Sequence, residues 1–175
     1  LSNGESKWIT SDESRKDVQS LRAISCAIIT SNQTVLADDP SLNVRMDEFS
    51  SDDQPLRIVI DSSEKCSGNE KIFQLPGETI IYKERVNESF LKYLGSMEIN
   101  DALVEAGPRM NGALLKSGLI DELIIYMSPC ILGDNAKDMF EFPAIEKLSD
   151  RYSFDIHDLH KIGTDMKITL RKKDV

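Results

Sequence analysis

The chain has 175 residues, a formal net charge of −9 and a pI of about 4.8, and 40% of its residues are hydrophobic. This length suits one domain with a substantial core, and the negative charge disfavours nucleic acid and anionic membranes as partners. No apolar run reaches the length of a membrane span, so we expect no membrane association. The three cysteines form no C-x-x-C pair and no histidine cluster accompanies them, which favours the reducing cytoplasm and predicts no metal site.

The first half of the chain alternates helical and extended segments. Capping residues Thr10 and Ser11 precede a helical stripe of Val18, Leu21 and Ile24, which predicts a helix ending near Ile24. Further along we predict a buried strand at 26–30, a short helix before Pro40, a small extended segment at 42–45, an exposed acidic loop at 46–54, and strands at 56–61 and 79–82.

The second half continues the alternation and then changes character. We predict a helix at 88–97, a strand at 102–105, a helix at 109–117 capped by Gly118, and a strand at 121–127. Residues 154–162 and 166–171 alternate polar and apolar side chains, which is typical of antiparallel strands with one solvent-exposed face. The prediction is therefore one α/β domain whose mixed, mostly parallel sheet is flanked by helices and ends in antiparallel strands.

The turn after the strand at 102–105 is the first candidate site. Gly107-Pro108 breaks the strand, and the following helix presents free N–H groups that suit a phosphate or pyrophosphate. Glu105 lies at the strand end, where open α/β sheets place ligand-facing residues. The turn is neither a Walker loop nor a G-x-G-x-x-G fingerprint, so an ordinary strand-to-helix connection stays an open interpretation.

Two other turns carry polar side chains that have an ordinary structural interpretation as well. Asp38 and Asp39 precede Pro40 and suit a turn that bonds its own backbone. Ser62 and Ser63 either cap a turn or, with Lys65, hold the extra phosphate of NADPH. The remaining residues are assigned the usual environment of their type. We expect Trp8, Cys26 and Cys130 to pack in the core, and Arg22 and Arg45 to be exposed to solvent. We expect His157 and His160 to be structural or exposed.

Several strings occur here in an order that resembles one family. They are S-K-W-I-T at 6–10, D-V-Q and L-R at 17–22, T-V-L-A-D-D-P-S-L-N-V-R at 34–45, I-V-I-D-S at 58–62, V-E-A-G-P at 104–108, and G-A-L-L with G-L-I-D-E-L at 112–123. Together they resemble the reductase domain of the bifunctional riboflavin-biosynthesis deaminase–reductase. The resemblance runs from Leu1 to about Phe140, and more loosely to the C-terminus.

The resemblance implies a dihydrofolate-reductase-like fold and NADPH-dependent reduction of 5-amino-6-(5-phosphoribosylamino)uracil. It assigns substrate contacts to Ser6, Arg22, Leu42, Arg45 and Glu105. It assigns cofactor contacts to Trp8, Thr34, Asp38, Ser62 and the turn formed by Gly107, Pro108, Arg109, Met110, Asn111, Gly112 and Ala113. The two arginines would supply positive charge for a phosphorylated substrate in an otherwise acidic protein. Asp38 and Glu105 are both candidates to assist proton transfer, and the sequence does not rank them.

The chain also departs from the family pattern. Family members usually carry a strand and an S-L-D-G-type turn just before the position of Leu1, so we expect the natural protein to continue upstream, through that strand, into a zinc deaminase domain. The deaminase signature H-x-E with P-C-x-x-C is absent, so this stretch reduces without deaminating. Arg109 and Asn111 are bulkier and more polar than expected, and Arg109 either contacts a phosphate or points to solvent.

Two other functions stay open at this point. One is the related reductase that acts on the diaminopyrimidinone before deamination, which would share the fold, the cofactor and the ribosyl chemistry. The other is a non-catalytic module that binds phosphoribosyl compounds. The resemblance further suggests a homodimer, for which the apolar strand at 123–127 is either an interface or part of the core.

Overall fold

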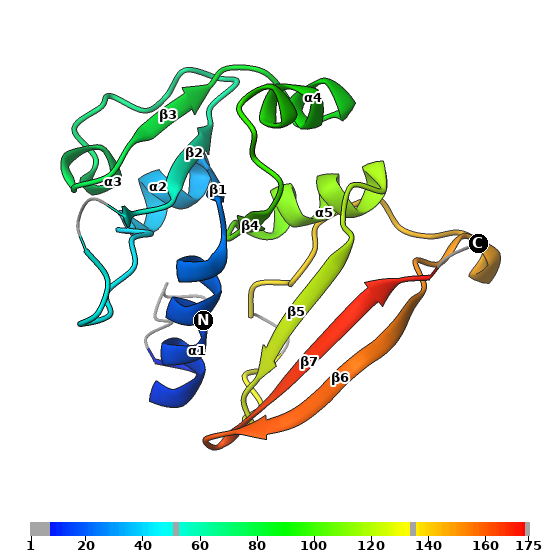
Figure 1. Ribbon diagram of the computed structural model, residues 1–175. Helices are drawn as coiled ribbons and strands as arrows, with labels where there is room; N and C mark the ends of the chain where they lie inside the picture. Colours follow the sequence, from blue (N-terminus) through cyan, green and yellow to red (C-terminus); the bar gives the residue numbers. More distant parts are fainter. Residues whose placement is uncertain (1–7, 51–52, 134–135, 174–175) are drawn as a thin grey trace.

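The computed structural model describes residues 8–50, 53–133 and 136–173, which form two β-sheets with helices around them (Figure 1). A parallel sheet has the strand order β3-β2-β1-β4, and an antiparallel sheet has the order β5-β7-β6. The elements in chain order are α1 (Asp12–Ile24), β1 (Ala27–Ser31), α2 (Asn32–Asp38), β2 (Leu56–Ile60), α3 (Lys71–Gln74), β3 (Thr79–Tyr82), α4 (Glu88–Ser96), β4 (Ala102–Val104), α5 (Pro108–Ser117), β5 (Glu122–Met127), β6 (Phe154–Ile162) and β7 (Asp165–Lys172).

The parallel sheet is covered on both faces because its strands are apolar on both sides. Alternate residues of β1 point into different core clusters. Ala27 and Ile29 pack with Phe90 and Leu94 of α4, whereas Ile28 packs in a second cluster with Val35 of α2, Leu42, Val59 and Ile72. This double burial explains why β1 and β2 are mostly apolar, with Arg57 the charged residue inside β2. None of the described helices is long and apolar enough to cross a membrane.

Helix α1 is tied to the antiparallel sheet by polar contacts. The Asp165 carboxylate at the start of β7 accepts a hydrogen bond from Ser11 N–H at 2.7 Å and one from Ser14 Oγ at 2.6 Å. One turn further on, Asp17 accepts a hydrogen bond from Tyr126 of β5 and pairs with Lys167 of β7 at 2.6 Å. Burial and the charge of Asp17 raise the pKa of Tyr126. These contacts fix the helix that carries Gln19 and Arg22.

The fold class is confirmed, but one continuous sheet is not what the chain forms. Strands β4 and β5 do not pair, and a cleft of about 520 Å³ separates them, lined by residues of both strands, of α1 and of α5. Edge strands leave N–H and C=O groups unpaired, so these two edges are suited to an extended segment between them. The additional strand expected from the resemblance stays a prediction. Hydrogen exchange of the β4 and β5 amides, compared with that of a chain extended by such a strand before Leu1, would test it.

Most predicted elements are confirmed within one or two residues, and the differences have physical causes. Cys26 and Cys130 are exposed rather than packed in the core: Cys26 is the residue before β1, and Cys130 lies in the segment beyond the end of β5. Ile24 of the predicted apolar stripe is 77% exposed at the last turn of α1. Residues 42–45 form no strand, since side chains rather than a neighbouring strand hold their backbone.

Candidate functional site

The ends of β2, β1 and β4 form one rim because these three strands are neighbours in the parallel sheet. Asn32, the first residue after β1, joins this rim to the loop after β2. Its Nδ2 donates to Asp61 Oδ1 at 2.6 Å and to Ser63 Oγ at 2.8 Å. The sequence therefore places polar groups at the edge where open α/β sheets bind ligands.

Asp61 organises the loop that follows β2. Burial raises the pKa of its carboxyl, but hydrogen bonds from the Cys66 and Lys65 N–H groups and from Asn32 outweigh that effect, so the pKa lies below its usual range. Burial of the Cys66 thiol, together with the negative charge of Asp61, raises the pKa of that thiol to about 12. Asp61 is thus a structural anion, while Ser62 and Lys65 beside it are exposed.

The second link along the rim joins β1 to β4. Gly107 N–H donates to Thr34 Oγ1 at 3.2 Å, so the turn before α5 lies against the first turn of α2. Gly107 is the N-cap of α5, Pro108 occupies the first turn, and no side chain caps the helix. Its free N–H groups and positive helix end suit an anionic diphosphate.

Arg22 of α1 and Glu105 after β4 form a two-point ion pair. Arg22 Nε lies 2.6 Å from Glu105 Oε1, and Nη2 lies 2.7 Å from Oε2. The remaining Arg22 nitrogen, Nη1, donates to Asn43 O at 3.1 Å. The Arg22 side chain is 9% exposed and that of Glu105 24% exposed. The default of a solvated Arg22 is wrong, and the carboxylate of Glu105 compensates its charge.

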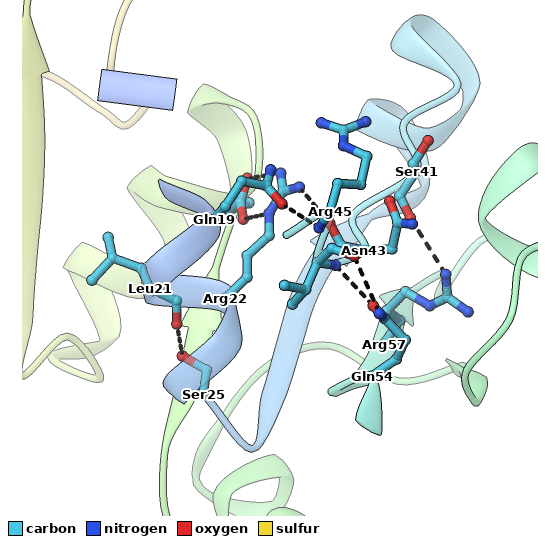
Figure 2. A network of polar contacts seen from close by, with 11 residues as sticks. Gln19, Leu21, Arg22, Ser25, Ser41, Asn43, Arg45, Gln54 and Arg57 are labelled. Atoms are coloured by element: carbon cyan, nitrogen blue, oxygen red, sulfur yellow. Dashed lines mark hydrogen bonds and ion pairs between the residues drawn. The ribbon is translucent and has the colours of Figure 1, made fainter. Parts of the chain in front are cut away.

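The loop at 39–45 carries the other predicted substrate residues. Arg45 is exposed, and no described residue pairs with its guanidinium (Figure 2). Leu42, by contrast, is buried in the core cluster with Ile28 and Val35. Asp38 is exposed at the end of α2 and has no partner among the described side chains, whereas Asp39 Oδ1 accepts a hydrogen bond from Lys71 N–H at 2.8 Å.

The first two turns of α5 face another part of this chain. The segment at 139–141 packs so closely that a Cβ on Gly112 would lie 2.1 Å from Glu141 O. Asn111 Nδ2 donates to Met139 O at 3.3 Å, and Arg109 Nε lies 3.8 Å from Glu141 Oε1. Gly112 therefore admits protein backbone, and the side chains of Arg109 and Asn111 anchor this segment. Met110 packs on the core cluster of Phe90, and Ala113 is exposed.

Trp8 and Ser6 complete the predicted set. Trp8 is 71% exposed, so the default of core packing is wrong, and the Arg15 guanidinium stacks 4.4 Å from the centre of its ring. Ser6 lies outside the described residues. No group of three or more His, Cys, Asp or Glu residues suited to a metal ion occurs within the described ranges.

Four residues of this region were not singled out by sequence reasoning: Gln19, Asn32, Gln54 and Arg57. Each acts through a hydrogen bond to a residue at least 10 positions away, and such contacts leave no local signal. The single available clue was a charged residue, Arg57, inside an otherwise apolar strand.

Comparisons with known proteins identify the family of this chain. A sequence model of the RibD C-terminal domain matches residues 1–168. The chain belongs to this family. It is 38% identical to the riboflavin biosynthesis protein RibD of Haemophilus influenzae, an alignment that covers 100% of the chain and 55% of that protein. It is 36% identical to a protein of Buchnera aphidicola named 5-amino-6-(5-phosphoribosylamino)uracil reductase, and that match covers 100% of both.

Solved structures agree with these sequence matches. Acinetobacter baumannii RibD superposes with a TM-score of 0.88 at 33% identity, over 98% of the chain and 53% of that protein. The riboflavin biosynthesis reductase Rib7 of Saccharomyces cerevisiae superposes with a TM-score of 0.68 at 20% identity, which supports the fold alone. The chain thus spans about half the length of the RibD proteins that it matches.

Proposed function

We propose that this chain is an NADPH-dependent reductase that converts 5-amino-6-(5-phosphoribosylamino)uracil to its ribitylamino product in riboflavin biosynthesis. The observation that carries the proposal is the rim itself. An uncapped helix start at Gly107 lies against Thr34. Arg45, whose guanidinium has no partner among the described residues, and the Arg22–Glu105 pair belong to the neighbouring loop and strand end. The named relative from Buchnera aphidicola matches this chain over its whole length.

The residues present fit a dinucleotide phosphate. The N-terminal turn of α5 offers backbone N–H groups without a competing side-chain cap, and Thr34 holds the turn in place through Gly107. Ser62 and Lys65 are exposed in the loop after β2, and they would bind the additional phosphate that distinguishes NADPH from NADH. When bound, the nicotinamide supplies the hydride, and the protein supplies alignment with C1′ of the opened ribose.

Charge separates the roles of the two arginines in this proposal. The Arg22 guanidinium bonds Glu105 and Asn43 O, so in this proposal it fixes the loop at 39–45 against the end of β4 rather than binding a free anion. The Arg45 guanidinium has no partner among the described residues, and it would bind the 5′-phosphate of the substrate with two parallel hydrogen bonds.

The proton that reduction requires is assigned to Asp38 in this proposal. Both Glu105 oxygens accept hydrogen bonds from Arg22, so the ion pair would have to open before Glu105 could carry a proton to substrate. Asp38 is exposed and unpaired among the described residues. We expect Asp38→Asn to reduce kcat by 10²-fold or more, in the range of general acid–base catalysis, with KM for NADPH within about threefold of wild type. Full activity in single-turnover assays of this variant would remove Asp38 from the mechanism.

The function is tested by following NADPH oxidation at 340 nm with two pyrimidines. We expect turnover with the phosphoribosylaminouracil and at least tenfold lower kcat/KM with the diaminopyrimidinone that precedes deamination. The reverse preference would identify the related reductase. Fluorescence titration that detects no NADPH binding at millimolar concentration would instead favour a non-catalytic module. We further propose that the protein carries an upstream zinc deaminase domain and forms a homodimer in the cytoplasm, to be checked by sedimentation of the full-length protein.

A further inference from the structure

The backbone at 41–45 is held by side chains from α1, from β2 and from the segment just before β2 (Figure 2). Gln54, just before β2, accepts from Val44 N–H at 2.8 Å and donates to Val44 O at 3.2 Å. Gln19 of α1 accepts from Arg45 N–H at 2.8 Å. Arg22 donates to Asn43 O, and Arg57 of β2 donates to Ser41 O at 3.4 Å. Four of the five residues in this loop therefore have a backbone group bonded to a side chain from elsewhere.

The loop needs this support because its backbone is strained. Leu42 has a φ of 46° and Asp39 a φ of 40°, a region that non-glycine residues seldom adopt. Such conformations are energetically costly and persist only where the surrounding structure holds them in place. Leu42 is also 5% exposed, so its side chain anchors the strained turn in the core.

Gln54 replaces a missing strand partner at this point. Its carboxamide bonds both the N–H and the C=O of Val44, as a neighbouring β-strand would. Gly77 leaves room for Gln54, because a Cβ at position 77 would lie only 2.7 Å from Gln54 Cβ. Val44 is buried and the next residue, Arg45, is exposed, so the hydrogen bonds to Val44 set the direction from which Arg45 leaves the backbone.

We propose that Gln54 and Gln19 are positioning residues that aim Arg45 at the substrate phosphate. This inference rests on the proposed function, because it takes Arg45 as the phosphate ligand. A guanidinium that forms two parallel hydrogen bonds requires a defined orientation, and a bond to Arg45 N–H on one side and to Val44 on the other supplies it. Neither glutamine needs to touch the substrate.

The test uses the wild-type chain, Gln54→Ala, Gln19→Ala, Arg45→Ala and the double variant Gln54→Ala/Arg45→Ala. We expect each glutamine variant to raise KM for the phosphorylated substrate about 10-fold, with kcat and the KM for NADPH within about twofold of wild type. With the substrate that lacks the 5′-phosphate, wild type and variants should have equal efficiency. The double variant should match Arg45→Ala alone, because a residue that acts through Arg45 adds nothing once Arg45 is gone.

Gln74→Ala is the matched control, since the exposed Gln74 at the end of α3 likewise bonds a loop carbonyl through Nε2, Gly68 O at 2.9 Å. It should leave all constants unchanged. Additive effects in the double variant, or equal losses with and without the 5′-phosphate, would overturn the inference. A wild-type chain that shows no turnover would instead count against the proposed function. If Gln54→Ala does not fold, Gln19→Ala carries the same comparison from α1.

Discussion

Arg22→Met is expected to lower the free energy of unfolding by about 2–3 kcal/mol and kcat/KM by roughly 100-fold. The substitution leaves the Glu105 carboxylate without its cation and Asn43 O without its donor. The stability loss lies below the range for a fully buried pair, because the Glu105 side chain is 24% exposed. Urea unfolding and steady-state NADPH oxidation measure the two effects separately.

A double variant separates structure from catalysis at this pair. Arg22→Met/Glu105→Leu removes both charges, so it should recover most of the stability while turnover stays low. Arg171→Met is the control, because its pair with Glu122 is exposed on both sides and should change stability by less than about 1 kcal/mol. Recovery of turnover in the double variant would show that the pair contributes only to folding.

Arg57→Met is expected to cost about 3 kcal/mol of stability, the second large effect. Arg57 is 1% exposed in β2 and donates to Ser41 O and to the carbonyls of Leu75, Pro76 and Gly77. Burial lowers the pKa of its guanidinium, and no described carboxylate pairs with it. Methionine fills a similar volume but leaves these carbonyls without donors, which is the main penalty.

Arg57→Lys tests whether geometry or charge matters at this position. An ammonium group keeps the charge but lacks the planar spread of donors, so we expect it to recover less than half of the loss. Urea unfolding of the three proteins at one pH gives the comparison. Equal stability of Arg57→Met and wild type, within about 0.5 kcal/mol, would show that solvent satisfies the carbonyls of 75–77 without the arginine.

The separation of β4 from β5 is a feature that sequence patterns could not predict. The apolar runs of β1, β2 and β5 predicted strands because period and composition are local properties. Whether β4 and β5 pair depends on what lies between them, and no pattern within either strand encodes that. In the same way, the sequence left open whether Gly112 faces a ligand or another part of the protein, and the tertiary structure shows the backbone of Glu141 packed against it.

The sequence by itself determined the order of helices and strands, the helix start at Gly107-Pro108 and the membership of a reductase family, because each depends on short strings or on periodicity. Only the tertiary structure decided that Arg22 pairs with Glu105, that the Arg45 guanidinium has no partner among the described residues, and that Gln54 hydrogen-bonds the backbone of Val44. Those outcomes depend on which groups meet after residues 10 to 83 positions apart have been packed together, and that distance in space is set by the whole core.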